Sequence, residues 1–154
     1  MKNGSFRLEP LLNYKRLIEE KLQQELAMIK ECLLKEEERL DALIARKERS
    51  VRQFTEHPRS EILLQEVLLY HHFLNQITLE VDRQKGVLDE IKKRLEEKRD
   101  ELVRASHEKK VVERLKQKRD RIDRKERAKA ERRILEEVAL HRYHRGGEDD
   151  SVEK

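Results

Sequence analysis

Apolar residues recur at alternating steps of three and four along the first third of the chain. The pattern runs for about six heptads, from Leu8 to Phe54. Three polar residues interrupt it, namely Lys15, Glu36 and Lys47. This a/d repeat is typical of a helix that packs along one narrow stripe, called here the seam, since strands alternate every second residue. Because Pro10 fits a first helical turn, we expect a helix over residues 10–56 after a lead over 1–9.

The segment TEHPRSEIL separates this helix from a second one. Pro58 disfavours helical geometry at His57, and Ser60 suits the cap of a new helix with Glu61 in its first turn. A connection this short between two long helices implies an antiparallel hairpin. We therefore expect a turn over residues 57–60.

A second repeat predicts a helix over residues 61–143. Its apolar positions are Leu63, Val67, Tyr70, Leu74, Ile77, Val81, Leu88, Ile91, Leu95, Leu102, Ala105 and Val112. Beyond these the repeat thins, apart from a short cluster at Ile134, Leu135, Val138 and Leu140. The sequence RGG at 145–147 is typical of a helix end. Residues 144–154, which are acidic towards their end, are expected to form a disordered tail.

The two predicted helices differ in length. At about 1.5 Å per residue they span roughly 70 Å and 120 Å. Folded back from a turn near residue 58, the first helix would cover the second only to about residue 108. Residues 109–143 are therefore expected to overhang. The predicted fold class is all-α, a long antiparallel two-helix coiled coil (an α-hairpin) with the second helix overhanging the first.

Composition agrees with long helices and argues against a thick core. Of 154 residues 45% are charged and 36% hydrophobic, with a net charge of +4, whereas globular domains carry about 25% charged residues. Such composition also occurs in disordered chains, but disorder gives no reason for a sustained period. The single cysteine, Cys32, cannot form an intrachain disulfide and is expected to be a partly buried free thiol.

Targeting segments and catalytic motifs are not found in the sequence. It has no run of about 18 apolar residues and no signal-peptide core, so we expect any membrane association to be peripheral. Glycine-rich phosphate loops, nucleophile elbows and H-E-x-x-H are absent. His71 with His72, and His141 with His144, lack further ligands at zinc spacing. We expect no enzyme activity, no metal and no cofactor.

A basic segment follows in the second helix. Residues 104–133 hold fourteen Lys or Arg and six Asp or Glu, whereas residues 8–41 hold nine acidic and six basic residues. A basic helix can neutralise phosphates, so nucleic-acid binding is one interpretation. The segment has no aromatic residue for base stacking, and it follows the repeat, whereas the basic region of a leucine zipper precedes it. A solvated or protein-facing surface is the favoured interpretation.

Large apolar side chains also lie off the seam in EVLLYHHFLNQITLEV, residues 66–81. The seam uses five of its residues, which are Val67, Tyr70, Leu74, Ile77 and Val81. Four others fall outside it, namely Leu68, Leu69, Phe73 and Leu79. Exposed apolar clusters usually mark interaction sites, so this end is expected to meet a partner. Local packing is the alternative, with Phe54 and Ile62 folded over Phe73.

Four segments, in this order and spacing, resemble the FliJ family of flagellar type III export proteins. They are FRLEPLLNYKRLIEEKLQQELA (6–27), YHHFLNQI (70–77), RASHEKKVVERLKQK (104–118) and LEEVA (135–139). In the last one Glu136 stands where the family usually has aspartate. The resemblance covers nearly the whole chain. It implies a non-enzymatic antiparallel coiled coil similar to the γ-subunit stalk of rotary ATP synthases.

The resemblance also implies partners. Such proteins insert the end with both termini into the hexameric flagellar export ATPase and promote its assembly and activity. They also contact the cytoplasmic linker of the membrane export gate and bind export chaperones. The implied location is the cytoplasmic face of the inner membrane at the flagellar basal body, without membrane insertion or nucleic-acid binding.

Site residues follow from the resemblance by position. The candidates for contact with the export gate are Tyr70, Phe73, Leu74, Ile77 and Gln84, and Glu80 is a polar departure from the family's patch. The candidates for contact with the ATPase ring are Leu8, Leu11, Tyr14, Leu135, Glu136 and Val138. Two other interpretations stay open: a generic scaffold coiled coil and a basic nucleic-acid-binding rod.

Overall fold

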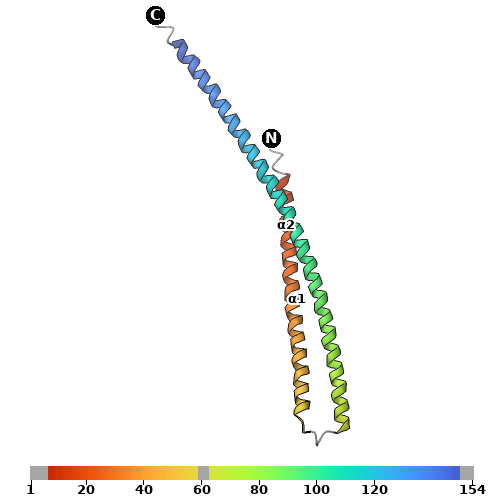
Figure 1. Ribbon diagram of the computed structural model, residues 1–154. Coiled ribbons are helices and arrows are strands. Elements are labelled where there is room, and N and C mark those ends of the chain that lie inside the picture. The colour runs from red at the N-terminus through yellow and green to blue at the C-terminus, as the bar shows by residue number, and fades with distance from the viewer. Residues whose placement is uncertain (1–6, 59–62, 150–154) are drawn as a thin grey trace. The chain divides into compact units, whose positions relative to one another are not determined.

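Two long helices make up the fold in a computed structural model of the chain. The structure describes residues 7–58 and 63–149, and no strand occurs within these ranges. Helix α1 spans Leu8–Glu56 and helix α2 spans Leu64–Asp149. Near their connected ends the two helices run side by side in opposite directions (Figure 1). The predicted all-α helical hairpin is confirmed.

The chain divides into two compact units, which are described separately. The hairpin unit comprises residues 17–106, and the terminal unit comprises residues 1–16 together with 107–154. In its described part, the terminal unit therefore contains the first turns of α1 and the second half of α2.

The core of the hairpin unit is a single line of side chains along α2. Seven side chains in this unit are at most 8% exposed, at steps of three and four with one wider gap: Ile77, Val81, Gln84, Leu88, Ile91, Leu95 and Ala105. Facing residues of α1, such as Leu33 and Leu40, are half-buried. Full burial of a large aliphatic side chain contributes about 1.5–3 kcal/mol, so this line supplies most of the apolar stabilisation of the pair.

In the terminal unit, α1 covers more of α2 than the sequence predicts. Leu12 is 1% exposed and Val112 is 7% exposed, and Glu9 pairs with Lys116. The prediction that α2 is uncovered over residues 109–143 is therefore wrong at the start of that range, where Val112 is buried and Lys116 pairs with Glu9 of α1. A turn centred at residue 58 would place Glu9 opposite about residue 107, but the connection is centred later, which shifts the pairing towards higher numbers in α2.

Beyond this covered part, α2 is bare within the described residues. Every side chain from Arg124 to Gly147 is exposed. The helix continues through Gly146 and Gly147 to Asp149, so the predicted helix end at 143 and the tail from 144 are corrected. Neither glycine has a positive φ, which means that a left-handed cap does not form here. A glycine costs only about 1 kcal/mol in a helix.

Some predictions lie outside the described residues. They concern the Ser60 cap, the contribution of Ile62, the lead over 1–6 and the end of the tail, residues 150–154. His57 and Pro58 are non-helical, and so is Leu63 just before α2.

Candidate partner-binding surfaces

A buried polar pair interrupts the seam of the hairpin unit. Gln84 is 8% exposed and occupies a seam position of α2. Its Nε2 donates to the backbone carbonyl oxygen of Glu36 at 3.0 Å and to the Glu36 carboxylate. A shifted register would leave this amide facing apolar side chains without partners, at a cost of about 1–3 kcal/mol. The pair therefore favours one alignment of the two helices.

A charged cluster supports the same unit further along. Lys98 Nζ lies 2.8 Å from Glu25 Oε2 on α1 and 3.1 Å from Glu101 Oε2 on α2. The hydrogen bond to Glu25, followed by the one to Glu101, raises the pKa of Lys98 above its ordinary value. The hydrogen bond from Lys98 lowers the pKa of Glu25. Each group thus stabilises the charged form of the other across the helix pair.

Ion pairs also join the helices of the terminal unit. Lys15 Nζ lies 2.6 Å from Glu108 Oε2, and Lys116 pairs with Glu9. The hydrogen bond from Lys116 lowers the pKa of Glu9. Lys15 is one of the three polar residues that interrupt the first repeat. Its ion pair with Glu108 on α2 explains why a lysine occupies this seam position.

The end of the hairpin carries an aromatic surface, formed by Phe54, Leu69, Tyr70 and Phe73. The rings of Phe54 and Tyr70 stack with centroids 3.8 Å apart and planes 5° apart. The guanidinium of Arg46 lies 5.3 Å from the centroid of the Phe73 ring, a cation–π contact worth about 0.5–1 kcal/mol at an exposed site. Together with Ser50, Gln53 and His57, these side chains line an open groove of about 370 Å³. Phe54 thus stacks on Tyr70. The alternative of local packing predicts instead that Phe54 lies over Phe73.

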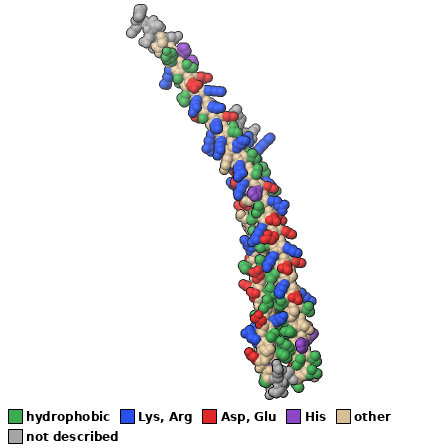
Figure 2. Space-filling view, in the orientation of Figure 1, with side chains coloured by type: hydrophobic (Ala, Val, Ile, Leu, Met, Phe, Trp, Pro, Cys, Tyr) green, Lys and Arg blue, Asp and Glu red, His purple; other side chains and the backbone are tan. Residues whose placement is uncertain are grey.

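The five gate candidates divide by accessibility. Tyr70, Phe73 and Leu74 are half-buried. Ile77 and Gln84 are 2% and 8% exposed, so their side chains belong to the seam. Three apolar neighbours on α2 are at least 56% exposed, namely Leu68, Leu69 and Leu79. Figure 2 shows hydrophobic side chains gathered at this end of the helices.

The six ring candidates lie in two groups within the terminal unit. Leu8 is half-buried beside α2, and Leu11 and Tyr14 are 41% and 59% exposed. The group at 135–138 is exposed, with Leu135 at 67% and Val138 at 45%. Since Glu9 pairs with Lys116, the second group lies roughly 30 Å further along α2 at about 1.5 Å per residue. The structure therefore does not bring the two groups together.

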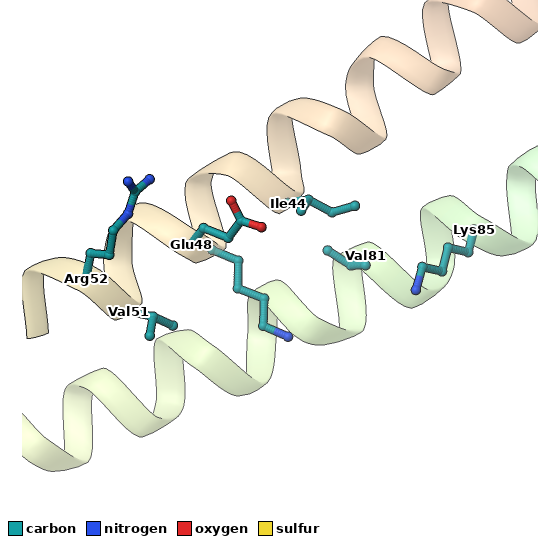
Figure 3. Close-up of a pocket in the computed structure, with 7 residues that line it drawn as sticks. Ile44, Glu48, Val51, Arg52, Val81 and Lys85 are labelled. Carbon is teal, nitrogen blue, oxygen red and sulfur yellow. The ribbon is translucent and has the colours of Figure 1, made fainter. Parts of the chain in front are cut away.

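A second groove, which we call the lateral groove, has no counterpart among the sequence-predicted sites. It holds about 620 Å³ and is lined by Ile44, Lys47, Glu48, Val51, Arg52, Val81 and Lys85. Ile44 and Val81 extend towards each other between the helices, and Val51 points towards α2 (Figure 3). Arg52 extends away from α2 at the rim (Figure 3). The sequence offered one signal for this groove, the interruption of the repeat at Lys47.

The remaining candidate groups show no assembled site. In residues 7–58 and 63–149, no group of three or more His, Cys, Asp or Glu is placed to hold a metal ion. His72 contacts Gln76 at 3.3 Å, and His144 lies edge-on to Tyr143. Cys32 is exposed, which corrects the expectation of a partly buried thiol. None of the described helices is long and apolar enough to cross a membrane.

Comparison with known proteins bears on the whole chain. A family model described as flagellar FliJ protein matches residues 4–148. No curated protein and no solved structure matches the chain. The family match covers α1, α2 except its last residue, and all the surfaces described above. The chain therefore belongs to the FliJ family, which makes it a component of flagellar protein export.

Proposed function

We propose that this chain is the central stalk of the flagellar export ATPase complex. One end inserts into the hexameric ATPase and promotes its assembly and activity, and the hairpin end contacts the export gate. The observation that carries the proposal is the bare helix at 124–147, in which all side chains are exposed, in a chain of the FliJ family. A long helix with exposed apolar residues and no covering partner among the described residues is expected to be completed by another protein.

The chemistry of the bare helix supports contact with a ring. Five large apolar side chains on it are 45–81% exposed, namely Ile134, Leu135, Val138, Leu140 and Tyr143. Before them lies the basic segment 104–133, which would be attracted to carboxylates of a surrounding channel. We propose Leu135, Glu136 and Val138 as ring contacts. Leu8, Leu11 and Tyr14 then form a second contact group at the start of α1.

The aromatic surface is proposed as the contact for the export gate. Tyr70 and Phe73 supply rigid rings beside exposed leucines, and aromatic residues dominate the energetics of many interfaces. Leu74, Ile77 and Gln84 are proposed as further gate candidates, and Ile77 and Gln84 lie in the seam. Export chaperones are proposed as further partners, and the cytoplasmic face of the inner membrane is the proposed location. Neither nucleic-acid binding nor membrane insertion is part of the proposal.

Reconstitution with the flagellar export ATPase tests the stalk function. The purified chain should promote ring formation, seen by sedimentation and electron microscopy, and should raise the rate of ATP hydrolysis. The double variant Leu135→Ala, Val138→Ala should lose both effects. A matched control is Leu34→Ala, since Leu34 is 61% exposed but lies in the hairpin unit. An unchanged hydrolysis rate with no ring formation by the unaltered chain would contradict the proposal.

The two ends should serve different partners. Phe73→Ala should weaken binding to the cytoplasmic domain of the export gate by about tenfold or more, the usual effect of truncating an aromatic anchor. It should leave stimulation of the ATPase intact, whereas the Leu135 and Val138 variant should show the reverse pattern. If both variants lost both partners equally, separate contact surfaces would be ruled out. Circular dichroism of each variant checks that the helices persist.

A further inference from the structure

The three polar interruptions of the first repeat behave differently in the structure. Lys15 pairs with Glu108, and Glu36 accepts hydrogen bonds from Gln84. Lys47 is half-buried at the seam, but among the described residues it forms no ion pair and no side-chain hydrogen bond. A cation at the edge of an apolar seam has lost part of its hydration, so an anionic partner would offset this cost.

The other cations of the lateral groove are unpaired as well. Within residues 7–58 and 63–149, neither Arg52 nor Lys85 forms an ion pair. Glu48 is the one carboxylate among the lining residues, and it is exposed and bonds to none of the cations. By contrast, Lys98 and Lys116 pair with carboxylates of α1. Three cations thus line this groove beside a single lining carboxylate, and none of the three is in an ion pair among the described residues.

The floor of the groove is aliphatic. Val81 is 6% exposed, and Ile44 and Val51 are half-buried. The floor and the cationic rim together match the chemistry of an amphipathic helix that carries carboxylates beside its apolar stripe. The space of about 620 Å³ accommodates several aliphatic side chains, and its open form suits a helix better than an enclosed small molecule.

The lateral groove and the aromatic surface lie on opposite flanks of the seam. With 3.6 residues per turn, the α1 residues Ser50 and Gln53, which line the aromatic surface, are turned away from Ile44, Glu48 and Arg52, which line the lateral groove. A partner on one flank therefore leaves the other flank open.

We propose that the lateral groove binds an acidic amphipathic helix of another protein, at a site separate from the aromatic surface. Apolar residues of that helix contact Ile44 and Val51, beneath which Val81 is buried, and its carboxylates pair with Lys47, Arg52 and Lys85. The proposal depends on the hairpin fold and not on the stalk function. The two therefore fail independently.

The test uses the full chain and a designed peptide. The probe is a fluorescent helical peptide of about 18 residues, long enough to keep helical structure, with leucines at steps of three and four flanked by glutamates. A second probe has glutamine at every glutamate. The acidic probe should bind about tenfold or more tightly than the glutamine probe, because charge pairing supplies the specificity. Methyl NMR signals of Ile44, Val51 and Val81 should shift.

Charge reversal then locates the site. The variant Lys47→Glu, Arg52→Glu, Lys85→Glu should bind the acidic probe about tenfold or more weakly. The matched control is Lys30→Glu, Lys93→Glu, Arg104→Glu, which changes net charge equally at three exposed positions of the hairpin unit outside the groove. This control should bind like the unaltered chain. Thermal unfolding of both variants shows whether each is folded.

Several outcomes would overturn the proposal. These are equal binding by both variants, equal binding of both probes, and no binding of the acidic probe to the unaltered chain. Shifts at Phe54, Tyr70 and Phe73 in place of the groove methyl groups would assign the probe to the aromatic surface. Dimerisation that buries the same methyl groups in sedimentation and NMR would assign the groove to a second copy of the chain.

Discussion

Gln84 and Glu36 form the contact on which the alignment of the helices most depends. The amide is buried in an apolar line and meets both the backbone and the carboxylate of Glu36. A single polar residue in such a position typically sets register and orientation at some cost in stability. The contact is therefore expected to contribute specificity more than stability.

Substitutions at this pair should distinguish the two contributions. Gln84→Leu alone should lower the free energy of unfolding by about 1–3 kcal/mol, because the carboxylate and the backbone carbonyl of Glu36 lose the donor that Gln84 supplies, while Arg39 stays 3.4 Å from the carboxylate. Adding Glu36→Leu should restore or exceed the original stability. Urea unfolding followed by circular dichroism measures both. Glu38→Leu, at an exposed position of α1, serves as control, and equal stabilisation by the single and double variants would contradict this account.

The Lys98 cluster should make stability depend on pH in a defined direction. Because the pKa of Glu25 is lowered from its ordinary 4.5, its contribution is present above that value and is lost as pH falls through the lower, folded pKa. The pKa of Lys98 is raised from 10.5, so its contribution persists below that value and is lost only at higher pH. The pair therefore stabilises the fold across the neutral range.

Thermal melts check this dependence. Glu25→Gln should lower Tm at pH 7, and the difference from the unaltered chain should shrink as the pH falls below about 4.5. Glu20→Gln, at an exposed carboxylate without an ion pair in the described residues, should give no such pH dependence. A constant difference at all pH values would show that charge pairing is not the cause.

At the scale of the elements, α2 is a helix whose two halves are held differently. Its half in the hairpin unit packs along a line of apolar residues, whereas side chains from Arg124 to Gly147 have no covering partner among the described residues. Helical propensity alone must therefore maintain residues 124–147, and charged residues with good propensity, such as Glu, Lys and Arg, are frequent there. Glycine should consequently matter differently in the two halves.

Gly86→Ala should stabilise the protein. A Cβ atom at Gly86 meets nothing within 4 Å, and its φ is not positive. Alanine should therefore add about 0.5–1 kcal/mol to the free energy of unfolding by raising helix propensity. Gly146→Ala is the control, because the bare end of α2 frays without unfolding the hairpin and Tm should not change. A decrease in stability for Gly86→Ala would reveal a close contact at that position.

At the scale of the whole molecule, both helices of the pair come from one chain. The ion pairs and the Gln84 contact join the two helices within one chain, so folding should need no second copy. Tm should therefore be the same over a hundredfold range of protein concentration, as mass action requires for a monomer. Sedimentation should give a single monomeric species. A Tm that rises with concentration, or a stable parallel dimer, would contradict the intramolecular hairpin.

The sequence predicted the fold well because the a/d period determines which residues face the partner helix. It predicted the pairing less well, because register depends on where the connection is centred, and a small displacement there moved the partner of Glu9 to Lys116. The pattern also treats every interruption alike. It did not separate Lys15, which has a partner, from Lys47, which lines the lateral groove. Whether a polar residue in the repeat has a partner depends on which side chain of α2 lies opposite it, and the repeat of one helix does not contain that information.

The stacked rings of Phe54 and Tyr70 have a consequence for folding kinetics. The two residues are only sixteen positions apart in the chain, whereas Glu9 and Lys116 are separated by 107. The conformational-entropy cost of closing the shorter loop is about 1.7 kcal/mol lower. The helices should therefore begin to zip at the aromatic stack, and stopped-flow refolding of Tyr70→Ala should be slower than that of a variant near Leu12. Tyr70 would then serve both folding and the proposed gate contact, so a substitution that changes gate binding would also change the folding rate.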